Sequence, residues 1–180
     1  MDLLTFHLDE REFGVDLGRV REIISPPPIT RVPGMPPALL GVFGLRGDPT
    51  AAVDAGIRLA GRPITISGRT PIVILSAILD ERPLQFGLLV GAAGRKLSVE
   101  KLLPWTEGLA RFTGDDPCMG FADVDGTFVL VLDVDKLLSL EQVTAFQRAA
   151  PARAVPPPLP ASSAAPHRRA ASAPTVPARA

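Results

Sequence analysis

The chain has 180 residues, of which 46% are hydrophobic and 21% charged, as is typical of a globular protein. Its formal charge of zero hides an asymmetry: residues 1–150 carry 15 Lys and Arg against 19 Asp and Glu, whereas the last 30 residues carry four Arg and no acidic residue. The acidic body disfavours nucleic acid as a partner, because phosphate contacts need clustered basic side chains.

Cysteine content and hydropathy set further limits. Cys118 is the single cysteine, so the chain cannot form an intrachain disulfide or a cysteine-rich zinc site, which fits a reducing cytoplasm. The first residues lack the basic and apolar regions of a signal peptide. The longest apolar run, Pro71–Leu79, is far shorter than the roughly 20 residues that a membrane-spanning helix needs. We therefore expect a cytoplasmic protein with no direct membrane insertion.

The N-terminal segment predicts a hairpin followed by a short helix. Leu4, Phe6 and Leu8 alternate with polar residues, and the alternation resumes at Phe13 after a turn at residues 9–12. The spacing then changes, because apolar residues recur every three or four positions over residues 17–24. This predicts one or two helical turns, ended by the prolines that follow.

Short apolar runs bounded by Gly, Pro or Asp predict the remaining strands. They cover Leu39–Leu45, Thr50–Val53, Ile72–Leu79, Leu84–Val90, Leu97–Leu103, Met119–Val124 and Thr127–Leu132. Between them we expect a loop with one helical turn at residues 55–70 and a plain turn at Gly91–Ser98. Asp125-Gly126 is a strong hairpin signal, because both turn positions favour positive φ.

The C-terminal part divides at residue 149. Residues 133–148 carry an apolar stripe and acidic residues at their start, which predicts a closing helix. Residues 150–180 are rich in Pro, Ala and Arg and have few large apolar side chains, so we expect a disordered tail after a domain at 1–149. Nine or ten short strands with one closing helix predict a mainly β fold, as a barrel or a sandwich.

No constellation of catalytic groups is evident. His7 lies on the polar side of a predicted strand and His167 lies in the tail, so neither is placed as a general base. Cys118 follows two aspartates, and such an acidic setting would raise its thiol pKa, the wrong direction for a nucleophile.

Two further patterns also lack a complete site. Gly91–Ser98 is only loosely similar to a phosphate-binding loop, because its Gly and Lys spacing does not match. Asp123, Asp125, Asp133 and Asp135 lack the other ligands of a calcium loop, and two of them belong to the predicted hairpin. We expect a protein that is not an enzyme and uses no cofactor or metal.

The segment Gly41–Gly47, with Ala52-Val53-Asp54 after it, resembles the CheW-like family. The family's motif reads Gly-Val-Ile-Asn-Leu-Arg-Gly and is followed by Pro-Val-Val-Asp-Leu. Other segments are similar to the family in order and spacing, over about residues 2–146. They are Phe6–Leu8, Phe13–Val15, Val20–Ile24, Ile29–Pro37, Phe86–Val90, Val129–Asp133 and Leu137-Leu138.

The resemblance implies a fold and a function. The fold would be two packed SH3-like five-stranded β-barrels with a C-terminal helix. The function would be that of a non-catalytic adaptor without a cofactor, which couples the cytoplasmic tip of a methyl-accepting chemoreceptor to the regulatory domain of a CheA-type histidine kinase. The edge of the first barrel, near the motif, is where the family is thought to meet the kinase.

The motif also supplies the candidate partner-binding residues, which are Gly41, Gly44, Arg46 and Gly47. By resemblance, Arg46 lies at the surface that faces receptor and kinase, where a guanidinium can bind carboxylates or carbonyls. The competing interpretation is an arginine that braces its own turn. Gly41 is either a contact or a glycine required at a bulge. The neighbouring apolar residues Val42 and Leu45, and likewise Val20, Ile23 and Ile24, are expected in the core.

Departures from the motif suggest a specialised member of the family. The motif's Asn is replaced by Gly44, and Asp48-Pro49 is expected to interrupt the strand that follows. We therefore hypothesise a diverged accessory paralogue, of the kind carried by Frz-type gliding-motility systems, with weakened kinase binding. The alternative is an SH3-like protein-binding module outside chemotaxis, although aromatic residues for a peptide groove make up only 5% of the chain.

Overall fold

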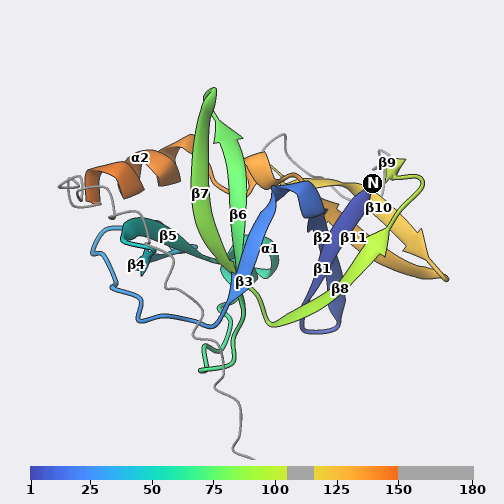
Figure 1. The fold of residues 1–180 in the computed structure, drawn as a ribbon, viewed down its shortest axis with the longest axis horizontal. Helices are drawn as coiled ribbons and strands as arrows, with labels where there is room; N and C mark the ends of the chain where they lie inside the picture. Colours follow the sequence, from blue (N-terminus) through green and yellow to red (C-terminus); the bar gives the residue numbers. More distant parts are fainter. Residues whose placement is uncertain (105–115, 150–180) are drawn as a thin grey trace, which may run out of the picture.

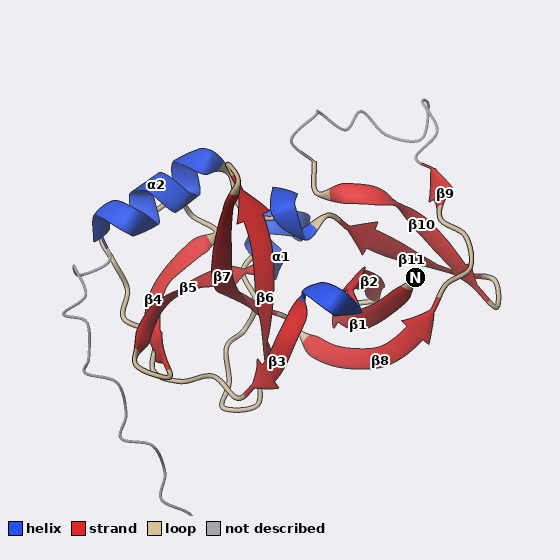
Figure 2. Ribbon diagram, turned by 45° about the horizontal axis from the view of Figure 1, so that its top comes forward, coloured by secondary structure: helices blue, strands red, loops and turns tan. Residues whose placement is uncertain are grey.

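The computed structural model describes residues 1–104 and 116–149, which form two curved β-sheets lying side by side (Figures 1 and 2). The terminal sheet contains β1 (Asp2–Leu8), β2 (Arg11–Asp16), β8 (Ala92–Ser98), β9 (Leu103–Pro104), β10 (Cys118–Val124) and β11 (Thr127–Leu132). The central sheet contains β3 (Val20–Ile24), β4 (Leu39–Leu45), β5 (Asp48–Asp54), β6 (Ile72–Leu79) and β7 (Arg82–Leu89). The mainly β prediction is confirmed.

Each sheet combines antiparallel hairpins with one parallel pair between strands distant in the chain. The terminal sheet has the order β8-β1-β2-β11-β10-β9 and the central sheet the order β3-β6-β7-β5-β4. The parallel pairs are β11 with β2 and β5 with β7. An isolated bridge between Thr30 and Val42 joins the segment after β3 to β4, so the central sheet curls toward closure. The sixth strand of the terminal sheet is the two-residue β9, next to the five strands that the resemblance implied.

One apolar core joins the two sheets. Phe6 and Phe13 of the terminal sheet stack with ring centroids 5.6 Å apart, and they belong to the same buried cluster as Phe86 and Leu88 of the central sheet. Phe146, from the last helix, is in this cluster too. The sheets therefore bury their facing sides against each other, and about 25 cal/mol per Å² of buried apolar area stabilises the arrangement.

The helix predicted over residues 17–24 is wrong. Leu17–Arg19 forms a single 3₁₀ turn, η1, capped by Asp16, and Val20–Ile24 is strand β3. β3 pairs antiparallel with β6, in a register that places Ile23 opposite Val73. Gly18 is a poor helix former, and the β-branched residues after it favour a pleated strand once a partner strand is available.

The turn predicted at Gly91–Ser98 is also wrong, since Ala92–Ser98 is strand β8 paired with β1. Gly94 lets the strands approach closely, because a Cβ on it would lie 2.2 Å from Thr5 Oγ1. The buried Thr5 hydroxyl there accepts the Arg95 N–H at 2.9 Å. A bond between a side chain and the backbone of a strand about 90 residues away has no local sequence signal.

The other two predicted helical elements are present, and the closing helix is shorter than expected. α1 (Ala55–Ala60) is the turn expected within residues 55–70. The closing helix, α2, spans Leu140–Ala149, and before it Val134–Lys136 forms a 3₁₀ turn, η2. Among the described residues, no helix has the length and apolar character that a membrane span requires. The tail predicted at 150–180 lies outside the described residues.

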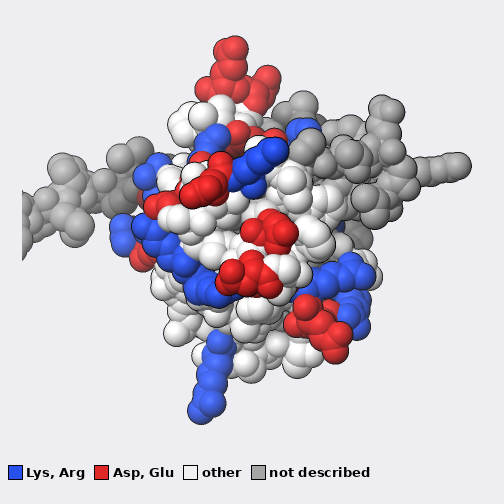
Figure 3. Space-filling model, turned by 90° about the vertical axis from the view of Figure 1, so that its right-hand side faces the viewer, with Lys and Arg blue, Asp and Glu red and all other residues white. Residues whose placement is uncertain are grey.

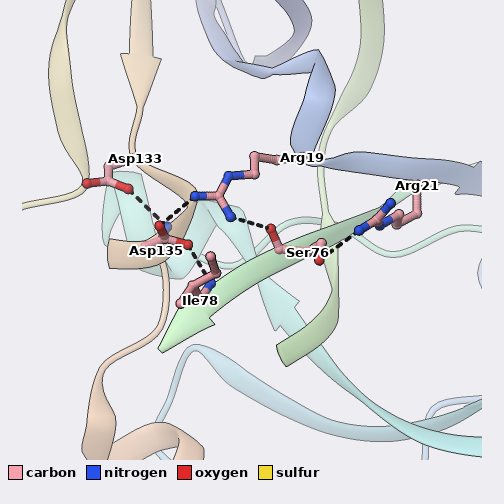
Figure 4. A network of polar contacts seen from close by, with 6 residues as sticks. All are labelled: Arg19, Arg21, Ser76, Ile78, Asp133 and Asp135. Atoms are coloured by element: carbon pink, nitrogen blue, oxygen red, sulfur yellow. Dashed lines mark hydrogen bonds and ion pairs between the residues drawn. The ribbon is translucent and has the colours of Figure 1, made fainter. Parts of the chain in front are cut away.

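A polar network ties the two sheets together where β6 extends beyond β3 (Figure 4). β3 pairs with β6 only as far as Leu75, so the edge of β6 is open from Ser76 onward. Asp135, on η2, accepts the Ile78 N–H through Oδ1 at 2.6 Å and Arg19 Nη2 through Oδ2 at 2.8 Å. Arg19 Nη1 also donates to the Ser76 carbonyl at 3.4 Å, so two side chains from outside the central sheet bind the open edge of β6.

Replacing Asp135 by Ala is expected to lower the free energy of unfolding by about 2 kcal/mol, because it leaves the Ile78 N–H and the Nη2 of Arg19 without their acceptor. Denaturant unfolding measures this loss. A double-mutant cycle with Arg19→Ala separates the ion pair from the Ile78 bond, which should survive loss of the arginine. A loss below about 0.3 kcal/mol would show that apolar packing alone holds this junction.

Candidate partner-binding surface

The motif residues form the β4–β5 hairpin, whose tip is a two-residue turn at Arg46-Gly47. Leu45 pairs with Asp48 across the turn, and φ is +53° at Arg46 and +90° at Gly47. Positive φ at both central positions defines a type I′ turn, which matches the twist of a two-stranded ribbon. Glycine adopts this conformation freely, but arginine does so only at a cost. The turn thus places the Arg46 side chain at the very end of a tight hairpin.

The expected interruption at Asp48-Pro49 does not occur, since both residues lie within β5. Leu45 and Asp48 close the turn as a hydrogen-bonded pair, so the next pair, Gly44 and Pro49, is of the non-bonded kind. The nitrogen of Pro49 therefore points away from β4. On its other side β5 pairs with β7 only from Ala51 onward. A proline at this position removes no ladder hydrogen bond.

Arg46 is both exposed and paired within the chain. Its side chain is 79% exposed, and its Nη2 lies 2.9 Å from Oε1 of Glu22 on β3, which is 28% exposed. A surface pair of this kind contributes about 0.2–1 kcal/mol to stability. The pair therefore holds the guanidinium in a defined place without fixing it tightly. The ion pair with Glu22 supports an arginine that braces its own turn, and the high exposure supports an arginine that contacts a partner.

Gly41 has a structural role. Its φ is +150°, it is buried, and a Cβ on it would lie 2.1 Å from the carbonyl oxygen of Thr30. It sits at the bulge between Leu39 and the rest of β4, beside the Thr30–Val42 bridge. The close approach of the Thr30 backbone therefore explains why residue 41 is a glycine, in agreement with the interpretation of Gly41 as a glycine required at a bulge.

Gly44 and Gly47 are exposed, for different reasons. Gly47 needs its positive φ for the turn, although a Cβ there would meet open space. Gly44 has neither a positive φ nor a crowded surrounding, because nothing lies within 4 Å of the point where a Cβ would stand. A glycine inside a strand weakens it, and such a position often marks the close approach of a ligand or another backbone. Of the four candidates, Gly44, Arg46 and Gly47 thus share the exposed tip and Gly41 does not.

The residues around the hairpin divide between core and surface. Val42 and Leu45 are partly buried against core clusters, as predicted, and so are Val20 and Ile24. Ile23 is 45% exposed, so its placement in the core was wrong. Because we predicted a helix here, we missed two features: Ile23 faces outward from β3, and Glu22 pairs with Arg46. The sequence Val-Arg-Glu-Ile-Ile does not alternate between apolar and polar residues, so it gave no strand signal that could have revealed either.

The groups considered for catalysis do not form a site with the hairpin. His7 is half-buried on β1. Burial raises the pKa of the Cys118 thiol, and the Asp116 carboxylate adds to the rise, against a lowering by a hydrogen bond with the Gly120 backbone. The direction expected from the sequence is confirmed, with burial as the main cause. Among the described residues, no group of three His, Cys, Asp or Glu side chains is placed to hold a metal ion.

Charge on the terminal-sheet end of the molecule is mixed (Figure 3). Basic and acidic side chains lie next to one another in this sheet, as in the pairs Lys96–Asp2 and Arg95–Glu12, with N to O distances of 2.9 and 3.7 Å. On the described part of this face, positive charges are thus interrupted by negative ones.

Comparison with known proteins gives one consistent result. Residues 2–142 match the family model of the CheW-like domain. The chain is 27% identical to the probable chemotaxis protein CheW of Rhizobium etli, over 77% of this chain and 87% of that relative. It is 26% identical to the chemotaxis protein CheW of Klebsiella aerogenes, over 79% and 84% of the two chains.

A solved structure shows the same fold. The crystal structure of the scaffolding protein TtCheW from Thermoanaerobacter tengcongensis superposes with a TM-score of 0.66 at 20% identity. The superposition covers 78% of this chain and 94% of that one.

Proposed function

The chain belongs to the CheW-like domain family, and from this premise we propose that it is a non-catalytic adaptor that couples a chemoreceptor to a CheA-type histidine kinase in the cytoplasm. Its relatives are chemotaxis proteins, and the structural neighbour is a scaffolding protein. The observation that carries the proposal is the exposed β4–β5 tip. There the family motif places an arginine that Glu22 orients and that solvent or a partner can reach.

The chemistry of this tip suits protein binding. A guanidinium offers five N–H donors in a planar fork, so it can keep one bond to Glu22 and still bind a carboxylate or carbonyl of a partner. The bare backbone at Gly44 and Gly47 on either side leaves room for that partner. Binding through a tight, preorganised turn also limits the conformational entropy that association costs.

We further propose that kinase binding is weaker than receptor binding in this member of the family. Of the two departures that suggested it, the Asp48-Pro49 strand break is absent, so the proposal rests on Gly44 in place of the motif's Asn. Titrating the chain against a cognate receptor cytoplasmic fragment and, separately, the cognate kinase tests this by calorimetry. Equal affinities would contradict the accessory role, and no binding to either would contradict the adaptor function.

Replacing Arg46 by Ala is expected to weaken partner binding at least tenfold, about 1.4 kcal/mol, with little change in melting temperature. Its side chain is mostly exposed, and alanine pays a similar conformational cost at this turn position. Arg69→Ala, which removes another exposed arginine, is the matched control and should bind normally. A large fall in melting temperature with unchanged binding would support the turn-brace interpretation instead.

A further inference from the structure

At Gly44 the backbone N–H and C=O face the outer edge of β4, which is the last strand of the central sheet. Because Gly44 and Pro49 form a non-bonded pair, the N–H and C=O of Gly44 point away from β5. Val42, two residues earlier on β4, also has its N–H and C=O pointing away from β5. There the N–H donates to the Thr30 carbonyl at 2.9 Å, and the carbonyl accepts the Thr30 N–H at 2.8 Å.

The chain itself does not continue this pairing to Gly44. In an antiparallel register that pairs Thr30 with Val42, the residue opposite Gly44 would be Pro28, which has no N–H to donate. The bridge is accordingly isolated, and within the described part of the chain no other backbone group bonds to Gly44. Gly44 is exposed, and because glycine has no side chain, its own residue does not cover this edge.

Two arginines lie beside this edge, and the exposed Asp48 lies across the hairpin on β5. Arg31, which follows the bridging Thr30, is exposed, and Arg46 is exposed two residues beyond Gly44. Glu22 is the acidic side chain bound to Arg46, whereas no ion pair neutralises Arg31 among the described residues. By the register of the bridge Arg31 stands opposite Gly41, so a segment lying along Gly44 would have an arginine position on either side of it, at residues 31 and 46, which favours carboxylates on that segment.

We propose that the outer edge of β4 at Gly44 is a strand-addition site for an extended acidic segment of a partner protein. One residue of the segment pairs with Gly44 as Thr30 pairs with Val42, through one N–H and one C=O. A neighbouring carboxylate binds Arg46. This inference rests on the proposed adaptor function and specifies how the partner is held. The open edge is only about one residue long, which explains how it can stay exposed without inviting aggregation.

Amide hydrogen exchange of Gly44 tests the site directly, using the full chain alone and in complex with the receptor fragment or the kinase. In the free chain Gly44 should exchange as an exposed amide, whereas Val42, bonded to Thr30, serves as the protected internal control. In the complex with the partner that docks here, exchange at Gly44 should slow at least tenfold. A complex in which Gly44 exchanges at its free rate would overturn the site and leave the adaptor function standing. The absence of any complex would overturn both.

A pair of variants gives the second test. Gly44→Pro removes the outward N–H, which the β4–β5 ladder does not use, and should weaken binding at least tenfold. Gly44→Ala also adds a side chain, which stands in open space in the free chain, but it keeps the N–H, so the proline variant should bind at least tenfold more weakly than the alanine variant. Circular dichroism verifies that both variants fold. Equal binding by two folded variants would contradict the proposal, and if the proline variant does not fold, the exchange experiment on the unmodified chain decides.

Discussion

Replacing Asp54 by Ala is expected to lower the free energy of unfolding by about 3 kcal/mol, one of the two largest effects that the structure predicts. Asp54 is 1% exposed. Its Oδ1 accepts the N–H groups of Gly56 and Ile57 at 2.8 and 3.1 Å, and its Oδ2 accepts the N–H of Ile64 at 3.1 Å. Alanine would leave all three donors without their acceptor at a largely buried site.

The role of Asp54 is to anchor the end of β5. It caps α1 and fixes the loop that returns past residue 64, while its own N–H donates to the Ala38 carbonyl at 2.8 Å. Loss of this anchor should loosen the base of the hairpin that carries Arg46. We therefore expect partner binding to weaken together with stability, unlike the effect of Arg46→Ala.

Two variants control this experiment, with urea denaturation as the measurement. Asp16→Ala removes a helix cap with a single bond, to the Gly18 N–H at 2.9 Å on the surface, and should cost about 0.5–1 kcal/mol. Asp54→Asn keeps one acceptor oxygen and should lose less than the alanine variant. If Asp54→Ala cost no more than Asp16→Ala, the buried bonds would not be the source of its effect.

Replacing Gly41 by Ala is expected to cost a similar amount, about 3 kcal/mol, by steric conflict and backbone strain. The Cβ would lie 2.1 Å from the carbonyl oxygen of Thr30, a contact with backbone that no rotamer change relieves. The φ of +150° adds a conformational cost that glycine does not have. To admit the methyl group, Thr30 must move away from Val42 and give up the bridge that helps to close the central sheet.

The same strand supplies a matched control, because Gly44→Ala adds the same methyl group where nothing lies within 4 Å. That variant should be neutral or stabilising by up to about 0.5–1 kcal/mol, since glycine in a strand costs conformational entropy. Thermal unfolding of the two variants side by side measures the difference. Equal melting temperatures would show that the segment at Thr30 shifts at negligible cost.

Local patterns were sufficient for much of the fold. The alternation at Leu4, Phe6 and Leu8 and the β-branched run Ile72–Leu79 predicted strands that are present. Asp125-Gly126 predicted a tight turn, and both residues have positive φ. These signals succeed because side-chain periodicity and turn conformation depend on residues only a few positions apart. The ordered motifs also sufficed to identify the family.

Segments whose conformation depends on distant partners were predicted less well. Val20–Ile24 has the spacing of a helix face but pairs with β6, about 50 residues later in the sequence. Pro49 suggested a strand break, yet the pairing phase set by the turn at Arg46-Gly47 leaves its nitrogen outside the ladder. At Val20–Ile24 pairing with a distant strand outweighed a weak local preference, whereas at Pro49 the phase of the ladder requires no bond from the proline nitrogen.

The candidate residues show the same division. The sequence by itself determined the mainly β class, the family, the tight turns and the four residues of interest at Gly41–Gly47, because each is encoded in a short pattern. Only the tertiary structure separated the buried Gly41 from the exposed tip, paired Arg46 with Glu22 and, within the described residues, left the edge of β4 open at Gly44. Burial, ion pairing and open strand edges are decided by which distant segments meet, and that depends on the packing and pairing of the whole chain.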